Sequence, residues 1–586
     1  MKCRVWMVCA VAALTLCMNA PALGRLARSG FRLATSWRSS YRGTSETVDA
    51  VRRMAALAKA SGKSIAYCRS RGNWLLPIER SRVLAMSWET APCPARNGSL
   101  LEIIDADAIV AAEYEPIIDS ELRGHGYSVR DSGGGVNLWC RGDGWKDYPA
   151  QQGRCGYISE IFSLSALAVL LTCCFFVCRC EGVVVGLLGI SVVMFVVGGV
   201  MGFVSLSSSL SVAAIVVGCL LLWKRYVTCC RRGFVPTAFV FTGRQMMVTV
   251  ILAIIYALLA LSHTFVAPNG LGTVGGRARL MFLAGGINDG FYTDSAFAPF
   301  QPAYPPGAAS LLLWCDALSG FCGEWIIQLL PCMLMAATAG YLASRLRSAL
   351  GVMFVLVAFT TPVSLRLATL FYPEVYVAIC CLIGWERVRE NRLDCIGWLL
   401  MGASGWFKNE GLVCFCSVAM AVLVVSPHIG FRRLALRAAL GAALPIAWHL
   451  GCRLAGASLD GYLPVYEPRI HQFVAAACRA LQYAFCSAWQ YAFLFPLAFV
   501  SMLVPRWRNG NLTTVVIAVL FAAVGFAVIF SLSAAPDFEW HLDSMERLLW
   551  VPSLFILREC AGILGCSEQT LATAHPGYGA DRSYAK

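Results

Sequence analysis

A short group of charged and polar residues separates two apolar runs of this chain. Lys408, Asn409 and Glu410 stand between the runs Cys395–Phe407 and Leu412–Val425. An ionisable side chain at the centre of a bilayer costs roughly 2.5–3.5 kcal/mol, so such groups persist at a membrane face, in ion pairs or along a wet cavity. A lysine there suits a phosphate, and a carboxylate suits proton transfer. We therefore expect polar chemistry at the membrane boundary around Lys408.

Three other stretches carry residues suited to the same chemistry, and each is expected at the same membrane face. They are Arg277, Arg279, Asp289, Asp294 and Tyr304 in one loop, Glu374 at the start of a helix, and Glu539, His541, Glu546 and Arg547 in a late segment. Together they suit transfer chemistry on a lipid phosphate, with a carboxylate as general base and Arg or Lys at the phosphate. The alternative is that each is a solvated residue at the end of a span.

The elements that must hold these residues are membrane helices. Of the 586 residues, 58% are hydrophobic and 14% charged, and the mean hydropathy is +0.64, which is not the composition of a soluble globular chain. The net charge of +14 comes from Lys and Arg in short loops between apolar runs. This pattern is typical of orientation signals, so we expect the lipid bilayer and not nucleic acid as the partner.

The N-terminal segment is predicted to lie outside the membrane. Residues 1–24 are typical of a signal peptide or a signal anchor, and either would send residues 25–156 out of the cytoplasm. That segment predicts a small extracytoplasmic α/β domain, with strands at Ser64–Tyr67, Leu101–Ile104, Asp107–Ala111 and Val136–Cys140. One or two disulfides are compatible with its four cysteines, which are Cys68, Cys93, Cys140 and Cys155.

From residue 157 onward, apolar runs alternate with basic loops so regularly that one orientation fits all of them. We expect about thirteen spans and an all-α polytopic protein of the cell (inner) membrane. Gly351–Leu365 and Cys486–Val504 are two of the predicted spans. The predicted divisions are three extra spans with a basic cytoplasmic loop at 157–244, a core at 245–563 and a polar cytoplasmic tail at 564–586. Scattered cations on the outer side, such as Arg277, Arg279 and Arg366, do not follow this orientation rule and need another explanation.

Three motifs in the segment from Gln245 to Ile563 resemble a known family. They are Arg277-Ala278-Arg279-Leu280 through Ala303-Tyr304-Pro305-Pro306-Gly307, the pair of Tyr372-Pro373-Glu374 and Gly405-Trp406-Phe407-Lys408-Asn409-Glu410-Gly411, and Trp540-His541-Leu542-Asp543-Ser544-Met545-Glu546-Arg547-Leu548. The segment resembles the GT-C superfamily of membrane glycosyltransferases, in particular the bacterial relatives of protein mannosyltransferases (glycosyltransferase family 39 type). The Lys-Asn-Glu-Gly run after an apolar helix is the most specific piece.

This resemblance implies an inverting transfer of a sugar from a polyprenyl-phosphate carrier to a lipid, glycan or protein acceptor at the outer face. It also implies an aspartate base in the first outer loop and often a divalent metal ion, for which the sequence identifies no ligands. The early part of that loop, Ala267–Gly276, contains no acid. Asp289 is therefore our first candidate for the base, with Glu374 next and Asp294 third.

The other polar residues are assigned to the donor or to the framework. Lys408 and Arg547 are candidates for the carrier phosphate. Further substrate contacts are expected from Asn409, Glu410, Arg277, Arg279 and Tyr304. His541 is an acid, a metal ligand or an interfacial residue. Two other classes stay open: a catalytically inactive scaffold or assembly protein, favoured by the missing early aspartate, and a secondary transporter.

Overall fold

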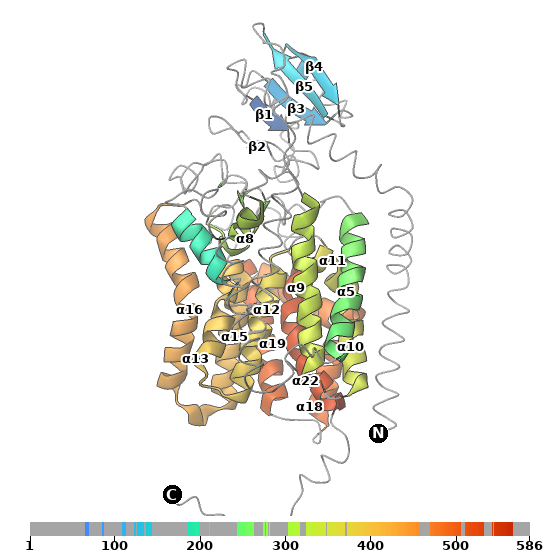
Figure 1. The fold of residues 1–586 in the computed structure, drawn as a ribbon. Coiled ribbons are helices and arrows are strands. Elements are labelled where there is room, and N and C mark those ends of the chain that lie inside the picture. The colour runs from blue at the N-terminus through green and yellow to red at the C-terminus, as the bar shows by residue number, and fades with distance from the viewer. Residues whose placement is uncertain are drawn as a thin grey trace, which may run out of the picture.

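The structure is a computed structural model, and it describes part of the chain. Among the described residues helices predominate, and Figure 1 shows them as a bundle with a small sheet beyond one end. Described are residues 65–68, 85–86, 108–112, 122–124, 126–133, 136–142, 186, 188–198, 210, 243–262, 274–275, 277–278, 281, 303–316, 324–346, 348–369, 372–457, 469–504, 510–531, 542 and 544–565.

The small sheet has five strands in the order β2-β1-β3-β5-β4. β1 (Ile65–Cys68) is parallel to β2 (Ala85–Met86) and β3 (Ala108–Ala112), and β5 (Val136–Arg141) is antiparallel to β3 and β4 (Tyr127–Gly133). The predicted strands therefore coincide with β1, β3 and β5, apart from Leu101–Ile104, which lies outside the described residues. Cys140 in β5 carries a free, buried thiol.

The bundle is built from helices of very different lengths. Upstream of the bundle proper is a short apolar helix, Leu188–Gly198. The others are α5 (Gly243–Ser262), α8 (Gly307–Asp316), α9 (Glu324–Ser344), α10 (Ala349–Phe359), α11 (Pro362–Thr369), α12 (Glu374–Glu390), α13 (Cys395–Gly402), α14 (Ser404–Phe407), α15 (Asn409–Val425), η7 (Pro427–Ile429), α16 (Phe431–Leu454), α17 (Ile470–Leu481), η8 (Gln482–Cys486), η9 (Ala488–Tyr491), α18 (Leu494–Leu503), α19 (Gly510–Ser531), α21 (Met545–Leu548) and α22 (Trp550–Gly565).

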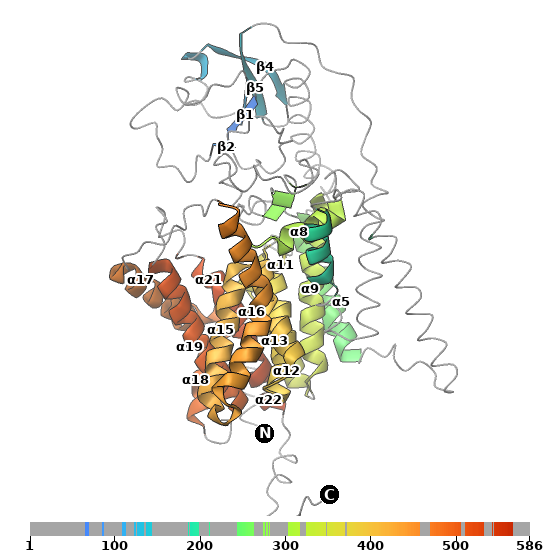
Figure 2. The same ribbon diagram turned by 90° about the vertical axis from the view of Figure 1, so that its left-hand side faces the viewer.

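α12 is the central helix, because it is buried on every side except near its last turn. A helix that is apolar all round is expected in a core, and α12 packs against α9, α13, α14 and α22. Figure 2 shows α17 and α19 on one side of α15 and shows α9 and α5 on the other. α13 and α16 approach closely through Gly402 and Gly441, since a Cβ on Gly402 would lie 2.0 Å from the Gly441 carbonyl oxygen.

Two of the described helices are long and apolar enough to cross a membrane, namely α16 and α19. The bent pair of α10 and α11 makes a third if the two count as one span. The remaining apolar helices in the described part of the chain, such as α15, are shorter. These helices indicate that the protein is associated with a membrane.

The predicted single span Gly351–Leu365 is divided, because α10 and α11 meet at an angle of 64°. Pro362 is the first residue of α11, where its missing N–H is tolerated, but it prevents α10 from continuing. The hydroxyls of Thr361 and Ser364 both donate to the carbonyl of Ala358, which satisfies one backbone group that the break exposes. The apolar run was predicted correctly from the sequence, but the bend within it was not.

The predicted span Cys486–Val504 is also interrupted. The π-helical turn η8 and the 3-10 turn η9 lead to two residues with left-handed backbone, Ala492 (φ 51°) and Phe493 (φ 58°), before α18 begins. Such a conformation costs a non-glycine residue roughly 1–3 kcal/mol, so the surrounding packing must impose it. Ala492 is completely buried.

Candidate functional site

One carboxylate and two cations meet at the start of α12. Glu374 Oε1 lies 2.9 Å from Lys408 Nζ and 3.2 Å from Arg547 Nη1. The three side chains are 2%, 7% and 11% exposed, so stretches distant in sequence form one buried ion cluster. Removing one partner of a buried ion pair typically costs 3–5 kcal/mol, because the remaining charge is left without compensation.

Glu410 and Tyr304 continue this cluster to a more open position. Glu410 Oε1 lies 3.0 Å from Lys408 Nζ, and the Tyr304 hydroxyl is 3.2 Å from Glu410 Oε2. The Glu410 side chain is 28% exposed, more than any other charged member. We call Glu374, Lys408, Glu410, Arg547 and Tyr304 the outer cluster, after the membrane face at which the sequence predicts them. Its two carboxylates balance its two cations.

A break in the helical backbone positions Lys408. The residue is extended (φ −160°, ψ 141°) between α14, which ends at Phe407, and α15, which begins at Asn409. Gly411 permits this tight turn, because a Cβ there would lie 2.4 Å from the Ser404 carbonyl oxygen. Glu410 falls in the first turn of α15, where the helix dipole favours a carboxylate.

Glu374 is held at the first residue of α12, directly after Pro373. Proline suits a helix start, and the positive end of the helix dipole stabilises the carboxylate there. Only one of its two oxygens is engaged. Oε2 is buried and has no hydrogen-bond partner among the residues that the structure describes.

Arg547, on the short helix α21, is oriented by two residues that sequence analysis did not assign to the site. Its guanidinium lies 4.6 Å from the centre of the Tyr372 ring, and its Nη2 donates to Ser544 Oγ at 2.9 Å. A cation over an aromatic face gains roughly 0.5–2 kcal/mol. Tyr372 stands two residues before Glu374, so the Tyr-Pro-Glu motif could have indicated it.

Arg277 is buried and binds the backbone at Tyr304 and Pro305. It is 1% exposed, and its Nη1 donates to the carbonyls of Tyr304 at 2.5 Å and Pro305 at 3.3 Å. Trp448 Nε1 donates to the neighbouring Ala303 carbonyl at 3.1 Å. Arg277 therefore positions Tyr304. This structural role gives a reason for a cation that the orientation rule does not expect on the outer side.

Arg366, another such outer cation, is also explained by pairing. It forms an ion pair with Glu546, the residue before Arg547. The backbone carbonyl of Glu546 accepts a hydrogen bond of 2.6 Å from Tyr491, which directly precedes the left-handed residues at the end of η9. The strained turn is thereby connected to the segment that carries Arg547.

Four predicted site residues, Arg279, Asp289, Asp294 and His541, lie outside the described residues, so their roles stay predictions. Asn409 is described next to Lys408. Its Oδ1 is buried and makes no hydrogen bond within the described part of the chain. The structure thus brings together Glu374, Lys408, Glu410, Arg547 and Tyr304 of the predicted set.

A separate ion network lies at the opposite end of α12. Glu386 pairs with Arg558 of α22, and Arg389 Nε lies 3.0 Å from Glu559 Oε1. Trp385 Nε1 donates to the same Glu559 oxygen at 3.2 Å. Each carboxylate is matched by a guanidinium, so this inner network holds α12 against α22 and was not foreseen from the sequence.

The divalent metal ion that the family resemblance implies does not fit the described residues. They include no group of three or more His, Cys, Asp or Glu able to hold a metal. The nearest carboxylates, Glu374 and Glu410, both contact the Lys408 ammonium, whose positive charge opposes a second cation there. No step is derived through a metal.

Comparisons with protein family models, with curated proteins and with solved structures found no match to this chain. The chemistry of the outer cluster must therefore be argued from its own groups. Lys408 and Arg547 converge on one oxygen position and can bind an anion such as a phosphate. Glu374 and Glu410 can accept a proton.

Proposed function

We propose that this chain is a membrane glycosyltransferase that moves a sugar from a polyprenyl-phosphate carrier to an acceptor on the extracytoplasmic face. The outer cluster is the observation that carries the proposal. Two cations, Lys408 and Arg547, lie within 3.2 Å of the buried Glu374 Oε1, and a second carboxylate, that of Glu410, lies 3.0 Å from Lys408 Nζ. Binding of a phosphate and removal of a proton from an acceptor hydroxyl need these groups side by side.

Each residue of the outer cluster has a role in this proposal. Lys408 and Arg547 bind the carrier phosphate, and Tyr304 and Asn409 contact the donor. Glu374 is the described residue best suited to act as base, since one of its oxygens has no partner within the described residues. Asp289 and Asp294 of the outer loop stay in competition for this role.

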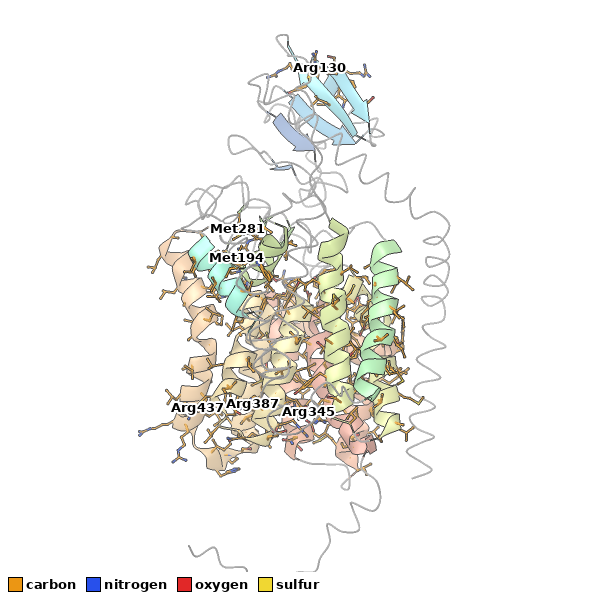
Figure 3. The ribbon with its side chains drawn as sticks, viewed as in Figure 1. Arg130, Met194, Met281, Arg345, Arg387 and Arg437 are labelled. Carbon is orange, nitrogen blue, oxygen red and sulfur yellow. The ribbon has the colours of Figure 1, made fainter. Side chains whose placement is uncertain are left out.

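The arginines at the opposite end of the bundle support an outer location for this cluster. Arg345, Arg387 and Arg437 lie at the end of the bundle away from the sheet (Figure 3), and cations favour the cytoplasmic side. Thirteen residues separate Glu374 from Arg387 on α12, which is about 20 Å of helix. The cluster would then lie near the outer boundary of a hydrocarbon layer about 30 Å thick.

The proposal includes the architecture expected from the sequence. About thirteen spans cross the cell (inner) membrane, three of them ahead of the core at 245–563, and an α/β domain of residues 25–156 lies on the outer side. Such a domain beside the outer cluster would suit the binding of an acceptor. The acceptor is a lipid, a glycan or a protein.

A scaffold or assembly protein without catalysis is the second candidate. It is favoured by the complete pairing of Lys408 and Arg547 with carboxylates of the chain itself, since buried ion clusters also serve as structural contacts. The absence of an acid in Ala267–Gly276 points the same way. The two candidates differ in one measurable property, the release of carrier lipid from a sugar donor.

The test is a transfer assay on purified protein in detergent with a labelled polyprenyl-phosphate sugar. The parent protein is expected to release the carrier, and Lys408→Met is expected to abolish both carrier binding and release, because the aliphatic stem stays while the charge is lost. Lys408→Arg, which keeps a cation, is the matched control and should retain binding. Normal transfer by Lys408→Met would refute the phosphate assignment. No release from any donor by the parent would favour the scaffold.

A further inference from the structure

The cations of the outer cluster are already occupied by the protein's own carboxylates. Lys408 contacts both Glu374 and Glu410, and Arg547 contacts Glu374. An anionic ligand that binds between Lys408 and Arg547 must therefore replace a carboxylate. Glu374 is the one that it must replace, because among the carboxylates that the structure describes Glu374 alone is paired with both cations.

The way in which Glu374 binds is unusual for a purely structural partner. An arginine and a carboxylate commonly form two parallel hydrogen bonds that use both carboxylate oxygens. Here Oε1 receives Lys408 Nζ at 2.9 Å and Arg547 Nη1 at 3.2 Å, while Oε2 is buried without a partner among the described residues. One oxygen thus sits between two cations, as a single oxygen of a bound phosphate would.

We propose that Glu374 takes the place of the carrier phosphate in the free protein, and that the arriving phosphate displaces its Oε1 from Lys408 and Arg547. This inference rests on the proposed function, because it takes the carrier phosphate as the ligand. Displacement leaves the Glu374 carboxylate beside the bound donor, free to accept a proton. Without donor the two cations hold that carboxylate, so the same exchange that seats the donor releases the base.

The exposures within the cluster indicate the side from which the phosphate enters. Glu374 is 2% exposed, whereas Glu410 is 28% exposed and, of the two cations, is paired with Lys408. The phosphate therefore meets Lys408 on the side of Glu410 and Tyr304 and then reaches Arg547. Glu410 is the right comparison for Glu374, because the loss of either carboxylate changes the charge of the site equally.

The experiment measures the binding of a polyprenyl monophosphate to purified parent, Glu374→Gln and Glu410→Gln in detergent. Glu374→Gln is expected to bind about tenfold more tightly than the parent, since the competing anion is gone. Glu410→Gln is expected to gain less than about threefold, since only one contact to one cation is vacated. The matching polyprenol, which lacks the phosphate, should bind the parent and Glu374→Gln equally.

Two results would overturn the exchange while leaving the proposed function in place. One is equal or weaker binding by Glu374→Gln, and the other is an equal gain by Glu410→Gln, which would reflect charge alone. If Glu374→Gln does not fold, Glu374→Asp is measured in its place. The shorter side chain moves the carboxylate away from Lys408 and Arg547, so this variant should bind the polyprenyl monophosphate moderately more tightly than the parent. A loss of affinity in Glu374→Asp would overturn the exchange. Absence of phosphate-dependent binding in every protein would refute the proposed function itself.

Inorganic phosphate separates the two sources of the ligand group. If it competes with the polyprenyl phosphate, and competes better in Glu374→Gln, the exchange occurs at the phosphate and is supported. Competition that is unchanged by Glu374→Gln would mean that phosphate binds elsewhere, and would overturn the exchange.

Discussion

Three acids are candidates for the general base of the proposed reaction. Glu374 lies in the outer cluster, while Asp289 and Asp294 belong to the predicted outer loop, beyond the described residues. Replacing the true base by its amide should reduce turnover roughly 10²–10⁴-fold without weakening carrier binding, because a base acts in the transition state. Glu374→Gln, Asp289→Asn and Asp294→Asn should each be assayed for turnover and for carrier binding. Near-normal turnover in all three would mean that none of them is the base.

Asp394 offers a separate test at the residue scale, because it lies in the turn between α12 and α13. Burial disfavours its charged form, but hydrogen bonds from Arg387 and from the backbone of Gly397 and Ile396 outweigh this and lower its pKa. Its stabilising effect is therefore present above the unfolded pKa, about 3.9, and is lost as the pH falls through the folded value. Asp394→Asn keeps an N-cap side chain and removes the ion pair with Arg387.

The expected result for Asp394→Asn is a stability lower than that of the parent by about 0.5 kcal/mol at pH 7. The difference should shrink below pH 4, because the parent then loses its charge as well. Thermal unfolding in detergent between pH 3 and pH 7 measures it. A difference that stays constant over this range would contradict an ionic contribution.

The residue types in the sequence predicted part of the site. The other members became apparent only from the contacts between distant segments in the structure. Lys408 and Glu410 were recognisable because charge between apolar runs is costly, and Glu374 and Arg547 because polar residues at the ends of predicted spans were expected at one membrane face. Tyr372, Ser544 and the pair of Arg366 with Glu546 were not, since a cation over a ring or beside a hydroxyl depends on how distant segments meet. The periodicity of apolar residues in a sequence does not show which distant segments come into contact.

At the scale of elements, α12 is held by ion pairs at both ends. Glu374 binds Arg547 before α22, and Glu386 binds Arg558 within α22. The two carboxylates are twelve residues apart on α12, which is about 18 Å. Charged contacts at both ends make α12 and the α21–α22 segment one unit, and they fix the helix that carries Glu374 relative to the helix that carries Arg547.

The contact between α13 and α16 yields a prediction with an internal control on the same helix. A Cβ on Gly441 would lie 2.5 Å from the Trp398 carbonyl oxygen, whereas nothing lies within 4 Å of a Cβ on Gly451. Gly441→Ala should therefore destabilise the protein by about 1–3 kcal/mol through overpacking. Gly451→Ala should be neutral or stabilise it by up to about 1 kcal/mol, because alanine favours the helix.

Thermal unfolding of both variants in one detergent measures this difference. A similar, positive effect of the two substitutions would mean that α13 and α16 do not approach through Gly441. The sequence alone did not separate the two glycines, because both lie in the apolar run of α16 and only the position of α13 distinguishes them.

The apolar runs predicted the helices but not their interruptions. α13, α14 and α15 coincide with the apolar runs Cys395–Phe407 and Leu412–Val425, because long apolar runs favour helices in a membrane protein. The bend at Pro362 and the left-handed turn at Ala492 depend on local hydrogen bonds and on packing. Hydropathy averages over such features.

At the scale of the whole molecule, orientation decides whether the proposed function is possible, because a polyprenyl-phosphate donor must meet the outer cluster on its own side. α16 is the best place to measure it. Its 24 residues are long and apolar enough to cross a membrane, and at 1.5 Å per residue its ends are about 36 Å apart. Arg433 near its start and Ala455 just after its end are both exposed.

The basic loops predict that Arg433 faces the cytoplasm and Ala455 the outer side. In a variant whose accessible cysteines have been removed, Ala455→Cys should react with a membrane-impermeant thiol reagent in intact cells, and Arg433→Cys should react only after permeabilisation. The unlabelled background protein is the control. The reverse pattern would turn the outer cluster toward the cytoplasm, since α12 and α16 belong to one bundle, and the proposed reaction at the extracytoplasmic face would then be excluded.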